Sequence, residues 1–247
     1  MSLVIAIDGP AGSGKSTLAK MLADKYSILQ VDSGALYRTY TWLSLKYAET
    51  AGVTDLSKIL EQNDCQNHLK GQHLEVLFEN GKQVIQVSQQ NVEPFIRDPQ
   101  ITNNIKAVAD AIWVRELVNQ KLQNLAQKYS IVADGRDMGT EVFPRADIKL
   151  FITASLAERA RRRFAEFEQK HPGISQTEVE QQIALRDAQD ESRPRGALKQ
   201  AEDAILIDTT SQTLDTAFNT IEQFLISSES SQIQSLIKEK KINQSRN

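Results

Sequence analysis

Nine residues near the start of the chain, positions 9–17, read Gly-Pro-Ala-Gly-Ser-Gly-Lys-Ser-Thr. Glycines at this spacing let successive backbone N–H groups point at phosphate oxygens, while the lysine reaches the outer phosphates and the next hydroxyl offers a ligand to Mg²⁺. The pattern predicts a site for a nucleoside triphosphate, with Lys15 also catalytic and Ser16 on the metal. The residues assigned to this site are Gly9, Pro10, Ala11, Gly12, Ser13, Gly14, Lys15, Ser16 and Thr17.

A set of arginines indicates what happens to the bound phosphate. Phosphoryl transfer spreads negative charge over the oxygens of the moving group, and a guanidinium stays charged and pairs with two such oxygens at once. Arginines follow predicted strands or lie on predicted helices at positions 38, 115, 136, 159, 161, 162, 163, 186 and 193. These residues favour transfer of a phosphoryl group, but they do not by themselves identify the acceptor.

Apolar runs that alternate with helical patterns predict the scaffold for these residues. Strands are expected near residues 3–8, 28–31, 130–134, 147–152 and 204–208. Helices are expected near residues 15–26, 34–50, 101–128, 155–169, 176–190 and 213–226. The alternation is typical of an α/β fold with a parallel sheet, in which ligands bind beyond the carboxyl ends of the strands.

One stretch departs from this alternation. Residues 74–78 and 84–87 are rich in β-formers, and the Asn80-Gly81 pair between them is a hairpin signal. Because a hairpin fits poorly into a parallel core, we place residues 60–95 in an inserted antiparallel subdomain. Residues 226–247 are rich in Ser, Lys and Gln, and we expect them to form a flexible tail.

The composition of the chain argues against several classes of protein. The chain has 247 residues, 40% of them hydrophobic, which is enough for a core, and its formal charge of −3 argues against a general nucleic-acid binder. Cys65 is the single cysteine, so no disulfide forms within the chain, and no run approaches the ~20 apolar residues of a membrane helix. We expect a cytoplasmic protein, monomeric by default, without membrane or nucleic-acid partners. The three histidines, His68, His73 and His171, are not spaced as metal ligands.

Four features occur together in order. They are the loop at 9–17, the segment Asp-Ser-Gly-Ala-Leu-Tyr-Arg at 32–38, the segment 133–144 that begins Ala-Asp-Gly-Arg-Asp-Met-Gly-Thr, and the trio Arg186, Asp190 and Arg193. With these features the chain resembles the bacterial cytidylate kinase family over residues 3–225. The resemblance implies a P-loop nucleoside monophosphate (NMP) kinase fold, with the hairpin in an NMP-binding insert and with a helical lid. It also implies ATP-dependent, Mg²⁺-dependent phosphorylation of CMP and dCMP to CDP and dCDP.

The resemblance also implies a division of the chain. Residues 1–225 form one kinase domain, whose core comprises 1–59, 96–154 and 196–225. The NMP-binding insert spans about 60–95, and the lid spans about 155–195. The expected tail follows this domain.

The acceptor nucleotide is assigned residues by the same resemblance. Ser33 and Asp137 contact the cytosine ring, and Arg136 lies near the base and the monophosphate. Arg38 and Arg115 hold the acceptor phosphate. An ionised aspartate accepts a hydrogen bond from the cytosine amino group, a contact that uracil does not offer, so such a site rejects uracil.

Lid residues complete the assignment. Arg186 and Asp190 face the ribose, and Arg193 reaches the transferring phosphate, helped by one or more of Arg159, Arg162 and Arg163. Arg162 is also assigned to ATP. The residues that the resemblance makes catalytic are Lys15, Arg136, Arg186 and Arg193.

Three positions depart from the family pattern. Lys106 stands where the family has a serine near the ribose, which leaves the preference between CMP and dCMP open. Gln189 replaces an arginine of the lid, so fewer phosphate contacts are expected there. Ile112 replaces a common proline, a change that we expect to be structural.

Other functions remain open from the residues alone. A P-loop kinase for UMP or AMP would share most of the chemistry. A non-catalytic nucleotide-binding switch would carry an Asn-Lys-x-Asp motif for guanine, which the chain lacks. An RNA-binding helper that uses the basic helix at 159–163 is disfavoured by the acidic balance and by the lack of stacking aromatics nearby.

Overall fold

The computed structural model describes residues 2–168, 173–227, 233–235 and 238. They fall into two compact units. The first unit contains the residues up to 30 and those from 125 onward, and the second contains residues 31–124. The chain passes between the units inside β2 (Leu29–Asp32) and inside α6 (Ile112–Lys128).

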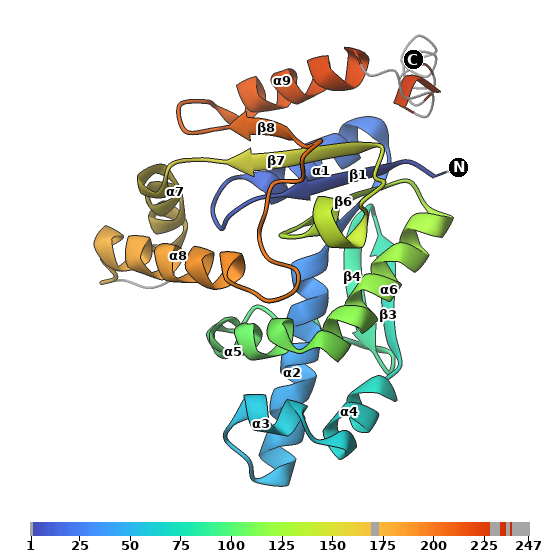
Figure 1. Ribbon diagram of the computed structural model, residues 1–247, viewed down its shortest axis with the longest axis vertical. Coiled ribbons are helices and arrows are strands. Elements are labelled where there is room, and N and C mark those ends of the chain that lie inside the picture. Colours follow the sequence, from blue (N-terminus) through green and yellow to red (C-terminus); the bar gives the residue numbers. More distant parts are fainter. Residues whose placement is uncertain (1, 169–172, 228–232, 236–237, 239–247) are drawn as a thin grey trace. The chain divides into compact units, whose positions relative to one another are not determined.

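The first unit is built on a five-stranded sheet of order β2-β6-β1-β7-β8. Figure 1 labels β6, β1, β7 and β8 of this sheet. Besides β2, its strands are β1 (Val4–Asp8), β6 (Ile131–Gly135), β7 (Ile148–Thr153) and β8 (Ile205–Asp208). The pairs β1–β6, β1–β7 and β7–β8 are parallel. All five strands agree with the predicted ranges to within one residue at each end, because each range was marked by a short, mostly apolar run.

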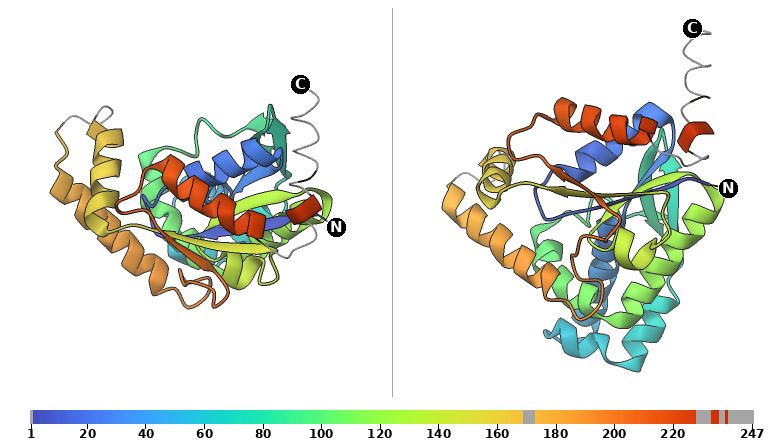
Figure 2. Two further views of the ribbon diagram at one scale, coloured as in Figure 1. Left: turned by 90° about the horizontal axis from the view of Figure 1, so that it is seen from above. Right: turned by 45° about the horizontal axis from the view of Figure 1, so that its top comes forward.

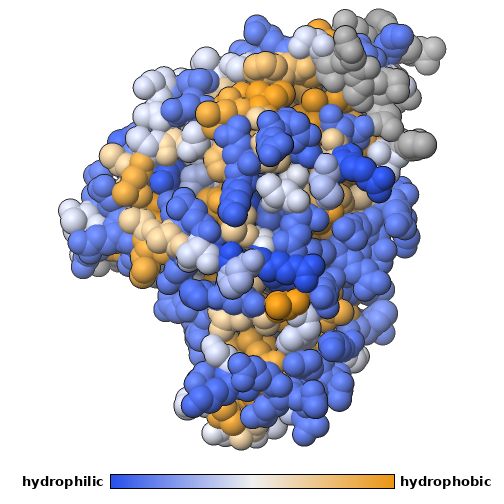
Figure 3. All heavy atoms as spheres, viewed as in Figure 1, coloured by the Kyte–Doolittle hydropathy of each residue, from blue (hydrophilic) through white to orange (hydrophobic). Residues whose placement is uncertain are grey.

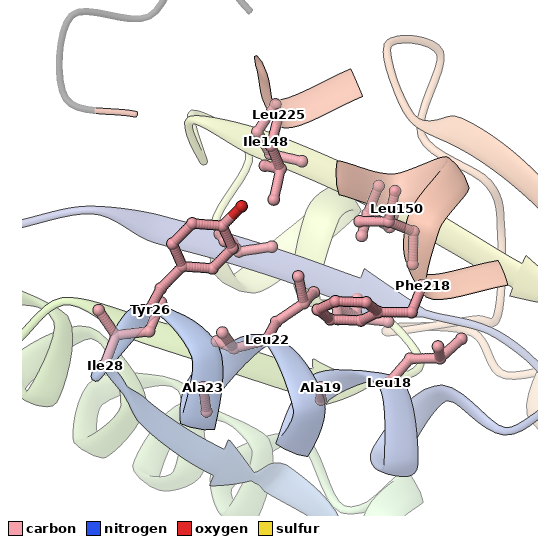
Figure 4. Packing of buried hydrophobic residues seen from close by; sticks show 14 of the residues in the cluster. Leu18, Ala19, Leu22, Ala23, Tyr26, Ile28, Ile148, Leu150, Phe218 and Leu225 are labelled. Atoms are coloured by element: carbon pink, nitrogen blue, oxygen red, sulfur yellow. The ribbon is translucent and has the colours of Figure 1, made fainter. Parts of the chain in front are cut away.

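A hydrophobic core joins the sheet to helices α1 (Lys15–Tyr26) and α9 (Leu214–Ser227). Leu18 and Leu22 of α1 point towards Phe218 of α9 and Leu150 of β7 (Figure 4). Leu22 is 0% exposed. This packing fixes the start of α1 against the end of β1, and therefore fixes the loop between them.

Two further helices of the first unit, α7 (Leu156–Glu168) and α8 (Gln176–Glu191), lie side by side where the chain leaves β7 (Figure 2). They share a small core of their own, formed by Ala160, Val179 and Ile183. Ser175 and Glu178 form a capping box at the start of α8. The two helices correspond to the predicted lid helices.

The second unit combines helices with a small sheet. The strands β3 (Leu74–Glu79), β4 (Lys82–Val87) and β5 (Gln90–Asn91) form an antiparallel sheet in that order. Asn80 and Gly81 link β3 to β4 with positive φ values of 51° and 74°, as the hairpin prediction requires. The helices are α2 (Ser33–Ala51), α3 (Leu56–Leu60), α4 (Asn63–Lys70), α5 (Pro99–Asp110) and most of α6.

The prediction of one helix over 101–128 is wrong. The chain forms α5 and α6, which are separated by Ala111 in an extended conformation (φ −70°, ψ 111°). Ile112 is the first residue of α6, a position at which proline is favoured in helices. The short helices α3 and α4 were not predicted.

The predicted tail begins inside a helix, since residues 226 and 227 end α9. Ile233 is helical and buried (1% exposed) in the core of the first unit. The remainder of the predicted tail, except residues 234, 235 and 238, lies outside the described residues, and so does His171.

Large hydrophobic side chains remain exposed over β8 and α9, where Figure 3 shows hydrophobic residues gathered at the top. They include Leu206, Phe224 and Ile226. Within the described ranges, no helix is both long enough and apolar enough to cross a membrane.

We predict that Leu22→Ala lowers the free energy of unfolding by about 2–5 kcal/mol, because it leaves a cavity in a closed core. Leu206→Ala is the control: Leu206 is 53% exposed, and its loss should cost less than about 1 kcal/mol. Denaturant unfolding of both variants measures the difference. Equal losses would show that Leu22 does not lie in a tightly packed core.

Candidate functional site

The loop between β1 and α1 has the shape that its glycines predict. Gly9 lies so close to β7 that a Cβ atom there would be 2.0 Å from the carbonyl oxygen of Ile152. Gly14, in the left-handed region with φ 87°, is the N-cap of α1, which starts at Lys15. The loop therefore leads directly into a helix N-terminus, which is an anion-binding arrangement.

Lys15 is buried at 7% exposure, and its Nζ donates a hydrogen bond to the carbonyl oxygen of Pro10 at 3.0 Å. The pKa of Lys15 is lowered to about 7, mainly by burial and also by the positive charges of Arg136 and Arg186, while Asp134 and Asp190 act in the opposite direction. These four side chains thus lie within electrostatic reach of the loop lysine.

Ser16 is bonded to a carboxylate at the end of β6. Its Oγ donates to Oδ2 of Asp134 at 2.6 Å. Gln30 holds the other side of this pair, since its Nε2 donates to Asp134 Oδ1 and to the Ser16 carbonyl oxygen, both at 3.1 Å. Hydroxyl and carboxylate oxygens next to a phosphate site are the ligand types that Mg²⁺ prefers, so the residues present fit this ion.

Asp8, the last residue of β1, anchors the loop that follows β6. Its two carboxylate oxygens accept hydrogen bonds from the backbone N–H groups of Met138 and Gly139, both at 2.7 Å. The pKa of Asp8 is raised to about 7, because burial, helped by the negative charge of Asp137, outweighs the two N–H donors, which lower it. The bonds place the neighbouring side chains of Arg136 and Asp137, the second of which is buried.

Arg136, Asp190 and Arg193 form a chain of ion pairs. Arg136 Nε donates to Asp190 Oδ2 at 2.7 Å, and Arg193 Nη2 donates to Asp190 Oδ1 at 2.5 Å. Burial would raise the pKa of Asp190, but Arg136, Arg193 and Arg186 lower it below its usual value. The structure therefore brings together four residues that the family resemblance assigns to the acceptor nucleotide or to the lid: Arg136, Arg186, Asp190 and Arg193.

Arg162 borders a hollow of about 530 Å³ beside the loop, which is also lined by Gly14, Lys15 and Leu214. Its Nη1 and Nη2 donate to the hydroxyl and the carbonyl oxygen of Thr209 at 3.0 and 2.6 Å, and its Nε donates to Glu158 at 2.8 Å. These bonds hold the guanidinium at the border of the hollow, and a guanidinium is a group on which an aromatic base can stack.

The other arginines of α7 differ from one another. Arg161 is exposed and makes two hydrogen bonds of 2.8 Å to Glu158. Arg163 is 37% exposed in its side chain and lies 3.6 Å from Glu166. Arg159 is buried, and its guanidinium bonds to Asp187 and to backbone carbonyl oxygens rather than lying open to a phosphate.

Three predicted residues belong to the second unit. Arg38 donates from Nη1 to the hydroxyl of Thr102 at 2.9 Å. Arg115 is 1% exposed and donates to the carbonyl oxygen of Ala109 at 3.1 Å. Ser33 is buried at the first position of α2.

Sequence reasoning missed several residues that support these groups. The spacing of Glu158 from Arg161 and Arg162, three and four positions along a helix, is a signal that could have revealed its role. Thr209 and Asp187 gave no such signal, because their partners are 47 and 28 residues away in the sequence.

Comparison with known proteins adds an independent finding. Residues 5–226 match the family model described as cytidylate kinase. The chain is 42% identical over 217 residues to a cytidylate kinase of Streptococcus suis, covering 87% of this chain and 92% of the relative. It is 35% identical over 238 residues to a cytidylate kinase of Lactiplantibacillus plantarum, covering 94% of this chain and 98% of the relative.

We predict a pH-dependent stability difference between the wild-type protein and Asp8→Asn. Because the pKa of Asp8 rises from 3.8 to about 7 on folding, its stabilising contribution is complete below about pH 4 and is lost as the pH rises through 7. The wild-type free energy of unfolding, taken relative to that of the variant, should fall by about 2–3 kcal/mol from about pH 5 to about pH 8. Urea unfolding at these two values measures it, and a difference that stays constant between them would show that Asp8 is already ionised in the folded state at pH 5.

Proposed function

Because this chain belongs to the cytidylate kinase family, we propose that it transfers the γ-phosphoryl group of ATP to CMP and dCMP, giving CDP and dCDP. The observation that carries the proposal is the convergence of Lys15, Arg136, Asp190 and Arg193 beside a P-loop. A phosphate-binding loop alone fits many reactions, whereas buried cations next to it fit transfer between two polyanions.

The donor nucleotide is proposed to bind along residues 9–17, with its phosphates on the backbone N–H groups and the helix N-terminus. Lys15 then exchanges its bond to the Pro10 carbonyl oxygen for bonds to phosphate. The base of ATP is proposed to lie in the hollow beside Arg162 and Leu214.

Mg²⁺ is proposed to bind at Ser16, with Asp134 contacting its water ligands. The 2.6 Å bond between these two side chains supports the assignment, since it places a hydroxyl and a carboxylate at one point of the loop. When bound, Mg²⁺ neutralises charge on the β- and γ-phosphates.

For the acceptor we propose the roles that the family resemblance implies. Asp137 and Ser33 select cytosine, and Arg136 lies by the base and phosphate. Arg186 and Asp190 face the ribose. The residues proposed for the acceptor phosphate are Arg38 and Arg115.

The proposed reaction is direct attack of a CMP phosphate oxygen on the γ-phosphorus, in line with the departing ADP oxygen. The attacking group is already anionic, so no protein base has to remove a proton from it. The protein's work is to position the groups and to neutralise charge: Lys15, Arg193 and Arg186 are the cations proposed to face the moving phosphoryl group.

Specificity for cytosine is proposed to come from the buried carboxylate of Asp137. Cytosine donates from its amino group to such an acceptor, whereas uracil places a carbonyl oxygen there. The mismatch would leave two buried acceptors facing each other, and buried unpaired polar groups are costly.

The remaining parts of the proposal concern organisation. We propose that residues 1–225 act as one kinase domain with an NMP-binding insert near 60–95. We propose that the helices within 155–195 act as a lid that excludes water during transfer. A monomer in the cytoplasm, without nucleic-acid partners, belongs to the same proposal.

The proposal predicts the outcome of an acceptor panel. In an ADP-release assay with CMP, dCMP, UMP and AMP, CMP or dCMP should give the highest kcat/KM. Turnover of AMP or UMP above CMP would reassign the acceptor, and ATP binding without turnover of any acceptor would favour a nucleotide-binding switch.

Arg136→Ala should lower kcat/KM for CMP by about 10²-fold or more, because the change removes a cation from the proposed acceptor site. It also removes one of the arginines that bond to Asp190. Arg195→Ala is the matched control, since Arg195 is 48% exposed in its side chain and its ion pair is with Glu141, a residue to which no acceptor or lid role is assigned. Circular dichroism checks that both variants fold. Equal activity of the two would contradict the role of Arg136.

A further inference from the structure

We propose that Arg159 and Asp187 form an ion-paired clamp on Ala11 that holds the phosphate-binding loop in the shape that binds ATP. The inference rests on the proposed function only in taking ATP as the ligand. It gives Arg159 a positioning role in place of the phosphate contact that the sequence suggested.

Both polar groups of the Ala11 backbone are hydrogen-bonded to the ion pair. Its N–H donates to Asp187 Oδ1 at 3.3 Å, and its carbonyl oxygen accepts from Arg159 Nη1 at 3.0 Å. Arg159 Nη1 also donates to Asp187 Oδ2, which closes a ring of three residues. A further bond of 2.9 Å from Arg159 Nε to the Ala154 carbonyl oxygen fixes the guanidinium from its other side.

The ring is shielded from water. Arg159 is 7% exposed and Asp187 is 8% exposed. Screening by solvent and salt is weak at such burial, so the ion pair retains more of its strength than a surface pair. A charged clamp of this kind holds a peptide unit in one orientation.

The backbone of α7 also touches the next residue of the loop. Gly12 has φ +77°, and a Cβ atom on it would lie 3.2 Å from both the Cβ and the carbonyl oxygen of Arg159. The position is both conformationally and sterically suited to glycine. Residue 159 therefore shapes the loop twice, through its guanidinium at Ala11 and through its main chain at Gly12.

Binding of phosphates is tighter when the donor groups are already oriented, because no ordering cost is then subtracted from the contacts. The clamp fixes the peptides of residues 11 and 12, which precede the N–H groups proposed to hold phosphate. Loss of the clamp should weaken ATP binding by about tenfold. CMP binding should stay within about threefold of wild type, since the clamp grips residues of the donor loop alone.

The same contacts would also be seen if the pair merely fastened α7 to α8. The two roles separate in the double variant Arg159→Met/Asp187→Leu. Replacing both partners of a buried ion pair by apolar residues is often neutral for stability, whereas removing one partner leaves a charge buried. The double variant removes the clamp without leaving an unpaired buried charge. It also removes the side-chain partners of the Ala11 and Ala154 backbone groups, so the thermal midpoint checks that it folds.

The test measures ATP and CMP dissociation constants by titration calorimetry, and the thermal midpoint of unfolding, for wild type, Asp187→Asn and the double variant. The clamp predicts that the double variant, shown to be folded by a cooperative thermal transition, binds ATP about tenfold more weakly than wild type. Lys20→Met/Asp24→Leu is the matched control, because it removes an exposed ion pair from α1 and should leave both dissociation constants unchanged.

Wild-type affinity for ATP in a folded double variant would overturn the clamp, whatever the acceptor panel shows. If Asp187→Asn does not fold, the double variant still decides the question. Weakened ATP binding in the variants together with no phosphorylation of CMP by the wild type would support the clamp and contradict the acceptor assignment, so the two proposals fail separately.

Discussion

The structure depends on holding several positive charges close together before any phosphate is present to neutralise them. Lys15 lies within electrostatic reach of Arg136 and Arg186, and Arg193 joins Arg136 at Asp190. Two acids offset this repulsion: Asp190 bonds to two of the arginines, and Asp134 lies at the Ser16 end of the loop. A bound polyanion would complete the balance, which explains why so many cations can converge on one loop.

Hydrogen bonds to the backbone, and not side-chain packing alone, hold the loops around this cluster of charges in place. The β1–α1 loop is held at Ala11 by the ring with Arg159 and Asp187, and the loop after β6 is held by the two N–H bonds to Asp8. In both cases a buried carboxylate receives main-chain N–H groups. The sheet supplies the rigid base, because β1 and β6 are adjacent and parallel and so end at the same edge.

The sequence predicts the parts of this arrangement that depend on local patterns. The P-loop, the five strands of the sheet and the Asn80-Gly81 hairpin follow from composition and spacing, and the structure confirms them. The break at Ala111 was missed because neither glycine nor proline marks it. Likewise, Arg159 and Asp187 lie on different helices and 28 positions apart in the sequence, and both bond to the main chain of Ala11, so no residue pattern reveals their pairing. The family can be recognised from sequence motifs, whereas the residues that support the site can be identified only from the three-dimensional structure.

The burial of Lys15 has a consequence for heats of binding. Because its pKa is lowered to about 7, the Lys15 amine loses its proton more readily than that of an exposed lysine. Phosphate oxygens beside the amine favour the ammonium form, so ligation takes a proton from the surrounding solution. The apparent enthalpy should therefore vary with the ionisation heat of the buffer, and the slope of that variation would give the total number of protons taken up on binding.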